Sequence, residues 1–182
     1  MKLKRTLLLV LPAALLIAVS WVLSRIPSHR GPTTVPSLPA EVVTVGGGEV
    51  TLYFADADTG LLIPLRRQIS QSPDDADTVL RELVKGPGPD EKGVGALPKG
   101  TEVLGTSLSD GVLTVNLNRT FEKDFPGSSA ASLLAVYSIV NTLTGLPGVQ
   151  KVAFEIEGKS ISVLGPLDVS EPLDSKPDMI AR

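Results

Sequence analysis

The sequence predicts an α+β domain over residues 49–173, a two-layer sandwich with two helices on one face of a mixed sheet. The sheet is expected to consist of three hairpins, in the order ββαββαββ. Three observations favour this class. Apolar residues alternate in six short runs, as in half-buried strands. Two longer runs have helical spacing, and turn residues separate the runs from one another.

The first expected hairpin joins strands at residues 50–55 and 61–69. Every second residue in both runs is apolar, apart from Arg67 in the second run. The segment DADTG at 56–60 supplies the turn, since Asp and Gly favour turn conformations.

The first helix is expected to begin near Ser72, and its apolar residues recur at helical spacing from Ala76 to Val84. The sequence SPDD at 72–75 offers a capping hydroxyl, an early proline and two carboxylates, all of which are favourable at a helix N-terminus. Gly86 and Pro87 end the helix, and residues 87–101 are expected to form a long loop.

The second hairpin and the second helix follow. Runs at 102–108 and 112–117 flank an Asp-Gly pair, which is a strong hairpin signal. A helix is expected at about 129–144, ended by Gly145 and Pro147. Its inward stripe is predicted to comprise Leu133, Val136, Tyr137, Val140 and Leu143.

The last pair of strands is expected at 152–156 and 161–163, with a turn at Gly158 and Lys159. The chain beyond Gly165 contains three prolines. It is expected to pack first as coil and then to fray, with residues 174–182 as a C-terminal tail.

Residues 1–25 are predicted to be a transmembrane anchor or a signal segment. Residues 6–23 carry no charge, and as a helix they would extend about 27 Å, enough to cross the hydrocarbon core. Cations at positions 2, 4 and 5 favour a cytoplasmic N-terminus and an extracytoplasmic C-terminal domain. Secretion after cleavage near the small residues 18–20 is the alternative.

Residues 26–48 are predicted to be a Pro/Gly-rich linker. Prolines stiffen it, and three glycines at 46–48 provide a flexible joint before the domain. His29 lies in this linker without candidate partners, so we expect a solvated side chain there.

Composition excludes several classes of chemistry. Among 182 residues there is no cysteine and one histidine, which excludes disulfides, a thiolate nucleophile, a cysteine metal site and a lipid-modified cysteine. Residues 1–30 have a net charge of +5 and the remainder −8, which disfavours nucleic-acid binding.

Acidic residues in the first turn suggest two kinds of site. Asp58-Thr59-Gly60 spells the aspartic protease triplet, but catalysis needs two such loops, and an Asx-type turn explains a single copy. Asp56, Asp58 and Gly60 also resemble the start of a calcium loop. Arg67, however, occupies the position of its closing glutamate.

Other polar motifs are weaker. The glycine-rich loop at 86–95 lacks the G-K-[ST] ending of a phosphate loop. Asn118-Arg119-Thr120 is a glycosylation triplet, which matters in eukaryotic secretion. Serines 128, 129 and 132 have no domain histidine as a base.

Two carboxylate pairs, Asp56 with Asp58 and Glu155 with Glu157, could formally flank a sugar. Glu155 and Glu157 alternate with core residues, which favours a solvated strand face instead. The mid-helix Asn141 is expected to bond to a neighbouring loop such as 87–101, with ligand contact as the alternative. We therefore assign no catalytic, cofactor-binding or metal-binding residue.

Short motifs in a characteristic order carry a family resemblance. They are LVKGP at 83–87, LPKGT at 97–101, DGVLTVNL at 110–117, IVNTLT at 139–144, PGVQKV at 147–152, EGK at 157–159 and LDVSEPL at 167–173. Together they resemble the GerMN (germane) domain, named for a spore germination and sporulation protein. The chain shows one copy where the namesake has two, and it lacks the lipid-attachment cysteine.

The resemblance implies a non-enzymatic, membrane-tethered extracytoplasmic scaffold module of a bacterial envelope complex, with a role in sporulation or spore germination. Its expected partners are other envelope proteins or a second copy, and the membrane through the N-terminal helix. No nucleic acid and no cofactor are expected. The alternative function is a sensor for a small cell-wall ligand such as a peptidoglycan fragment, which would need a concave pocket.

Overall fold

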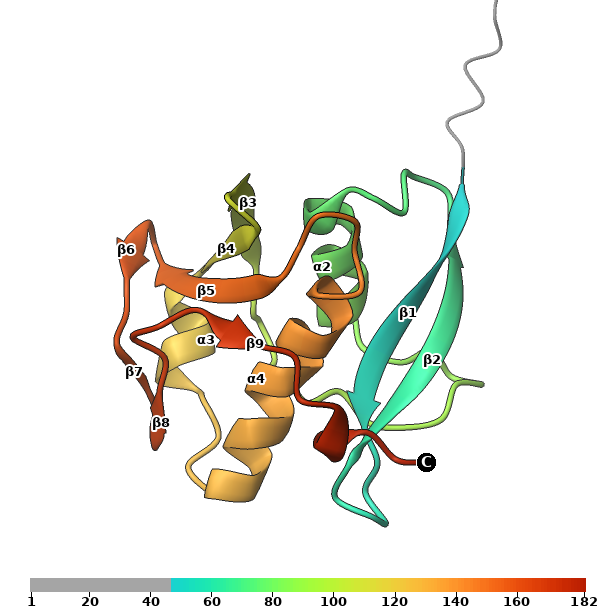
Figure 1. Cartoon of the computed structure of the whole chain (residues 1–182). Coiled ribbons are helices and arrows are strands. Elements are labelled where there is room, and N and C mark those ends of the chain that lie inside the picture. Colours follow the sequence, from blue (N-terminus) through green and yellow to red (C-terminus); the bar gives the residue numbers. More distant parts are fainter. Residues whose placement is uncertain (1–46) are drawn as a thin grey trace, which may run out of the picture. The chain divides into compact units, whose positions relative to one another are not determined.

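In the computed structural model, which describes residues 47–182, two helices lie between a β-hairpin and a larger sheet (Figure 1). The predicted anchor at 1–25, His29 and residues 26–46 of the linker lie outside the described residues. Within residues 47–182, no helix has the length and apolar character that crossing a membrane requires.

The first hairpin forms a two-stranded sheet of its own. Strand β1 (Gly48–Ala55) pairs antiparallel with β2 (Leu62–Ile69) along its whole length. The strand begins at Gly48, so the last glycine of the expected linker is already part of the hairpin.

The larger sheet has the strand order β3-β4-β5-β6, with β9 paired to another part of β5. Strands β4 and β5 run parallel, and the other pairs are antiparallel. Asp110 and Gly111 both have positive φ, as expected for a two-residue Asp-Gly turn between β3 and β4. The bounds are β3 (Val103–Ser109), β4 (Val112–Leu117), β5 (Lys151–Ile156), β6 (Lys159–Ser160) and β9 (Leu173–Asp174).

The predicted α+β class is confirmed, but the predicted single sheet of three hairpins is not what the structure shows. The first hairpin is separated from the larger sheet because the helices pack between them. The expected sixth strand at 161–163 does not form as one strand within residues 47–182. The chain instead forms β6 and then a small separate hairpin of β7 (Val163–Leu164) and β8 (Leu167–Asp168).

Three α-helices and one 3₁₀ helix complete the described residues. The Asp75 carboxylate caps α2 by accepting from the Thr78 N–H at 3.2 Å, so the helix begins after the expected Ser72. The Ser128 hydroxyl caps α4 by accepting from the Ala131 N–H at 3.3 Å. The bounds are α2 (Ala76–Val84), α3 (Arg119–Lys123), α4 (Ser129–Leu143) and the 3₁₀ helix η1 (Pro177–Met179).

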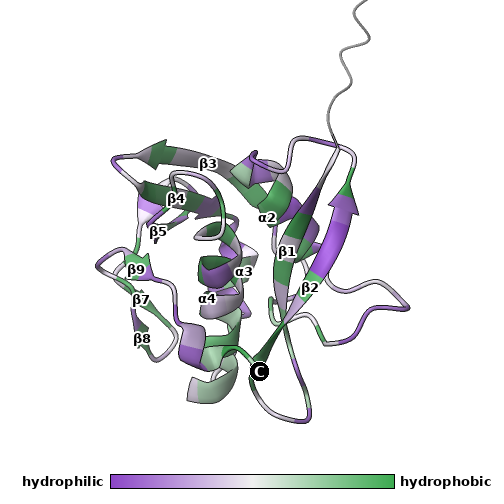
Figure 2. Cartoon of the chain, turned by 45° about the vertical axis from the view of Figure 1, so that its right-hand side comes forward, coloured by the Kyte–Doolittle hydropathy of each residue, from purple (hydrophilic) through white to green (hydrophobic). Residues whose placement is uncertain are grey.

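Helix α4 is buried on several sides because it contacts β1, α2, β5 and β8. Figure 2 shows hydrophobic residues on β1 and α2, two of the elements that α4 contacts. The predicted inward stripe is therefore incomplete: Ala135 and Ile139, outside the stripe, are fully buried, while Leu133 and Tyr137 are partly exposed. The helix forms the centre of the core and does not merely cover one face of a sheet.

The C-terminal segment does not fray as expected. Strand β9 pairs with β5, and Ile180 forms a parallel bridge with Leu62 at the start of β2. The Ala181 N–H donates to the Leu62 carbonyl at 2.8 Å. The segment from Leu173 to Ala181 thus connects the larger sheet to the first hairpin across α4.

Candidate functional site

The outer edge of β1, on the side away from β2, is the first candidate site. In an antiparallel pair, the backbone N–H and C=O groups of alternate residues point away from the partner strand. The Tyr53 N–H points away, because it donates to the Thr142 hydroxyl of α4 at 3.1 Å. The same alternation places the backbone groups of Glu49, Thr51 and Ala55 on this edge.

Part of this edge is already satisfied. Ala55 exchanges two backbone hydrogen bonds with Val94, at 3.0 and 2.8 Å, and Tyr53 is bonded to α4. Within residues 47–182, the outward backbone groups of Glu49 and Thr51 have no partner. The N-terminal half of β1 therefore presents an open strand edge.

A groove of about 420 Å³ lies along this open edge, and we call it the edge groove. It is lined by the outer edge of β1, by the turn before α2 and α2 itself, and by the C-terminal end of α4 with the turn after it. Its lining residues are Glu49, Val50, Thr51, Tyr53, Pro73, Asp74, Val79, Asn141, Thr142, Gly145, Leu146 and Pro147.

The edge groove is negatively charged. Glu49 and Asp74 are its charged lining residues, and both are acidic. The C-terminal end of α4 adds the negative end of a helix dipole, and its last turn contains no basic residue to offset it. Arg66 approaches Glu49 at 3.5 Å, but its side chain is 75% exposed, so solvent weakens this pair.

Asn141 borders the edge groove, but its amide is occupied. Its Oδ1 accepts from the Lys176 N–H at 2.8 Å, and its Nδ2 donates to the Lys176 carbonyl at 3.3 Å. The expected bond to a neighbouring backbone segment is therefore confirmed, but its partner is the C-terminal segment at Lys176 and not the loop at 87–101. The Asn141 amide pairs with the Lys176 backbone as a neighbouring strand would. These two bonds satisfy the amide, so it can be buried within a helix.

The second open edge belongs to β3, which pairs only with β4 among the described residues. Leu104 and Leu108 of β3 are about half exposed, at 49% and 50%. Strand β3 contains no charged residue, and charge is one common protection of an edge strand.

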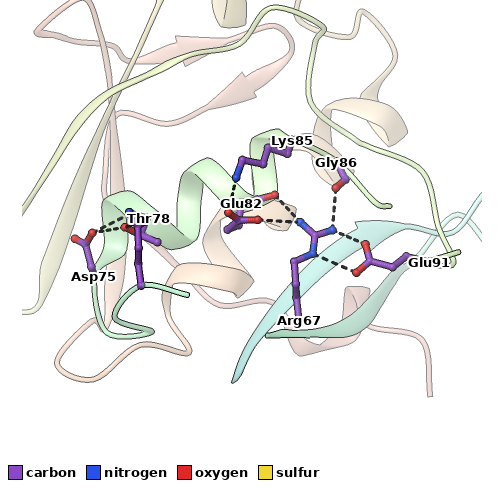
Figure 3. A network of polar contacts seen from close by, with 8 residues as sticks. Arg67, Asp75, Thr78, Glu82, Lys85, Gly86 and Glu91 are labelled. Carbon is purple, nitrogen blue, oxygen red and sulfur yellow. Dashed lines mark hydrogen bonds and ion pairs between the residues drawn. The ribbon is translucent and has the colours of Figure 1, made fainter. Parts of the chain in front are cut away.

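Arg67 forms a polar network that fixes the glycine-rich loop (Figure 3). Its guanidinium is bonded to both carboxylate oxygens of Glu91, and it donates to the carbonyls of Glu82 and Gly86 at 3.0 and 2.9 Å. Its bond to Glu91 lowers the pKa of that carboxyl below the ordinary value of 4.5 and raises the pKa of Arg67. Arg67 therefore joins β2, α2 and the loop.

The turn at 56–60 has the geometry expected of an Asx-type turn. The Asp56 carboxylate accepts from the Asp58 N–H at 3.1 Å and from the Thr59 hydroxyl at 2.7 Å. The Thr59 hydroxyl and the Asp58 N–H lower the pKa of Asp56. Across residues 47–182, no group of three or more His, Cys, Asp or Glu side chains is arranged to hold a metal ion.

The other residues considered above have structural contacts. Glu157 lies in the turn after β5, with a φ of 50°, and pairs with Arg119 at 3.1 Å, so it does not share a strand with Glu155 as expected. The Ser132 hydroxyl donates to the Pro126 carbonyl at 2.7 Å. Asn118 bonds to the backbone of Gly100 and Glu102 at 2.8 and 3.1 Å.

The residues of the edge groove come from three distant parts of the sequence, 49–53, 73–79 and 141–147. No motif joins these segments, so spacing along the chain could not reveal the site. The available signal was the alternation in β1, which predicted a strand without showing that one of its edges stays open.

Comparison with known proteins places these observations in context. The sequence model of the Germane family, described as "Sporulation and spore germination", matches residues 51–162. A search of curated proteins finds no match.

Solved structures that share the fold include three from bacteria. The first GerMN domain of the sporulation protein GerM from Bacillus subtilis is 22% identical with a TM-score of 0.56, over 72% of this chain and 98% of that one. The tandem GerMN domains of the same protein are 21% identical with a TM-score of 0.56, and the match covers 75% of this chain and 46% of that one. A candidate lipoprotein from Clostridium perfringens is 21% identical with a TM-score of 0.53, and the match covers 73% of this chain and 91% of that one.

Proposed function

The chain belongs to the Germane family of sporulation and spore germination domains, and from that premise we propose that it is a non-enzymatic protein-interaction module of a bacterial envelope complex. The observation that carries the proposal is the open edge of β1 along the edge groove. Backbone groups on an unpaired strand can hydrogen-bond to another polypeptide, and an uncovered edge is a known mode of protein recognition.

The proposed module is tethered to the cell membrane by residues 1–25, with the domain on the extracytoplasmic side. The uncharged run at 6–23 and the cations before it support this orientation. A structural neighbour that is itself a candidate lipoprotein supports an envelope location. N-terminal sequencing of the mature protein tests the tether: a chain that begins at Trp21 would show cleavage and secretion instead.

A second function is favoured by the shape of the edge groove. Its volume of about 420 Å³ and its convergent polar groups also suit a small cell-wall ligand such as a peptidoglycan fragment. We rank protein binding first because the unsatisfied groups belong to the backbone of a strand edge, which a polypeptide matches along its length.

Site-specific photo-crosslinking in native membranes tests the proposal. A photoreactive amino acid replaces Leu146, which lines the edge groove, and a control replaces Glu122, which is exposed on α3 outside the groove. We expect position 146 to give a discrete crosslinked protein that position 122 does not give. Uncrosslinked monomer alone, together with saturable binding of purified muropeptides, would reverse the ranking of the two functions.

A further inference from the structure

We propose that the edge groove binds an extended segment of a partner protein that carries lysine or arginine, and that this segment adds a strand to the outer edge of β1. The inference rests on the proposed function and specifies the chemistry of its partner. Its first support is the backbone geometry. The N–H and C=O groups of Glu49 and Thr51 point away from β2 and have no partner within residues 47–182.

The extent of the open edge sets the length of the bound segment. From Glu49 to Tyr53 a strand advances about 13 Å, since each residue contributes about 3.3 Å. Beyond this stretch the edge is closed, because Tyr53 donates to Thr142 and Ala55 is paired with Val94. The edge groove can therefore accept a short extended segment of about four to five residues along β1.

Charge complementarity selects a basic segment. The side chains of Glu49 and Asp74 and the C-terminal end of α4 all favour a positive group. A lysine or arginine side chain beside Asp74 would be attracted by these negative groups, whereas an acidic side chain would be repelled by them. Opposite charges across an interface also fix the register in which a strand binds.

A second copy of the same domain fits less well. Residues 47–182 contain 19 acidic and 12 basic residues, so two copies would repel each other. Strand β1 itself carries Glu49 and no basic residue. A different polypeptide with a basic extended segment is therefore the partner that the electrostatics favour.

Proline substitution tests the backbone contact. The Thr51 N–H points outward, so Thr51→Pro removes a donor for the partner and leaves the hydrogen bonds between β1 and β2 in place. Thr51→Val is the matched control, because it keeps the N–H and the branched shape.

The variant Asp74→Lys tests the role of charge in the edge groove. Its matched control is Asp58→Lys, which makes the same charge change in an exposed turn outside the edge groove.

The measurement uses the full chain in detergent micelles and fluorescence anisotropy of labelled, end-blocked peptides. One peptide alternates threonine and valine around a central lysine, and its twin has glutamate at that position. We expect the lysine peptide to bind at least about tenfold more tightly, because only it is attracted by the acidic groove. Thr51→Pro should weaken its binding about tenfold, and Thr51→Val less than about twofold. Asp74→Lys should abolish the preference for lysine, while Asp58→Lys should keep it.

Equal binding of both peptides, or unchanged binding to Thr51→Pro, would overturn the inference. If Thr51→Pro does not fold, a lysine peptide that is N-methylated on alternate residues provides the same test on the natural chain, and undiminished binding again overturns it. The photo-crosslink at Leu146 distinguishes failure of the strand geometry from failure of the proposed interaction function. If a partner protein is still crosslinked in the Thr51→Pro variant, the strand geometry is contradicted and the interaction function stands. Without any protein crosslinked there, the interaction function itself fails.

Discussion

At the scale of single residues, Arg67 and Asn141 each join segments that are distant in the sequence. Arg67 is 15% exposed, lies over the Phe54 ring at 5.6 Å and is bonded to Glu82, Gly86 and Glu91. Asn141 holds the C-terminal segment through Lys176. The polar side-chain atoms of both residues are hydrogen-bonded to other parts of the domain.

The network of Arg67 predicts a pH dependence of stability. The pKa of Glu91 is lowered in the folded state, so its contribution is complete above 4.5 and is lost as the pH falls through the folded-state pKa. We expect Glu91→Gln to lower the free energy of unfolding by about 1 kcal/mol at neutral pH, and by much less near pH 3. Urea unfolding at both pH values measures this. A difference that stays constant between them would contradict the assignment.

Asn141 provides a second prediction at this scale. Asn141→Ala should lower the free energy of unfolding by about 1–2 kcal/mol, because two bonds to the Lys176 backbone are lost. Hydrogen exchange should accelerate in residues 174–182. The control is Asn118→Ala, which also removes two backbone bonds but in another part of the domain. Faster exchange of the C-terminal segment in both variants would argue against a specific role of Asn141.

At the scale of elements, α4 is unusual because the sequence suggested an amphipathic helix and the fold buries most of its second half. Residues Ser138–Leu143 are all buried. The periodicity identified one apolar stripe, but small and polar residues such as Ala135, Ser138 and Thr142 also face packed neighbours. Their burial is compatible with the fold because the hydroxyls find partners: Ser138 donates to the Ala135 carbonyl, and Thr142 accepts from Tyr53.

The central position of α4 predicts an order of mutational effects. Ile139, outside the predicted stripe, is fully buried, whereas Leu133, within it, is partly exposed. We expect Ile139→Ala to cost about 3 kcal/mol and Leu133→Ala about 1 kcal/mol in free energy of unfolding. Denaturant titration of the two variants checks the order. If Leu133→Ala cost more than Ile139→Ala, the predicted amphipathic stripe would describe the packing of α4 better.

At the scale of the whole described unit, the C-terminal segment connects the two sheets. It pairs with β5 through β9, crosses α4 at Asn141 and bonds to Leu62 at the start of β2. The first hairpin and the larger sheet share no strand pairing, so this segment, the helices and the loop that bonds to Ala55 through Val94 connect them. The shape of the edge groove depends on this connection, since the groove lies between β1 and α4.

Truncation tests that connection. Ending the chain after Ser175 removes the Lys176 contacts and the bonds to Leu62. We expect a loss of about 2 kcal/mol, which for a domain of this size lowers the melting temperature by roughly 4–8 °C. Removing Arg182 alone should have little effect, because this exposed residue lies beyond the bonds to Leu62. An unchanged melting temperature after the longer truncation would mean that the segment adds no stability.

Much of the local structure was predictable from the sequence. Strands expected at 50–55, 61–69, 112–117 and 152–156 are found at 48–55, 62–69, 112–117 and 151–156. Helix ends agree within a few residues at Val84 and Leu143. These features depend on alternation, helical spacing and turn residues, which are properties of neighbouring positions. The family was also recognisable, because each of its motifs lies in one local turn, strand or helix end.

Long-range packing decided the rest. The bond between Tyr53 and Thr142 joins residues 89 positions apart, and that between Asn141 and Lys176 spans 35 positions. Such contacts determine that the first hairpin leaves the larger sheet, that α4 is central and that half of the β1 edge stays open. The positions of strands and helices follow from the order of residues along the chain, because backbone preferences and hydrophobic periodicity act locally. Which edges and faces meet is a property of the folded domain, because it depends on how the apolar surfaces of all segments are buried together.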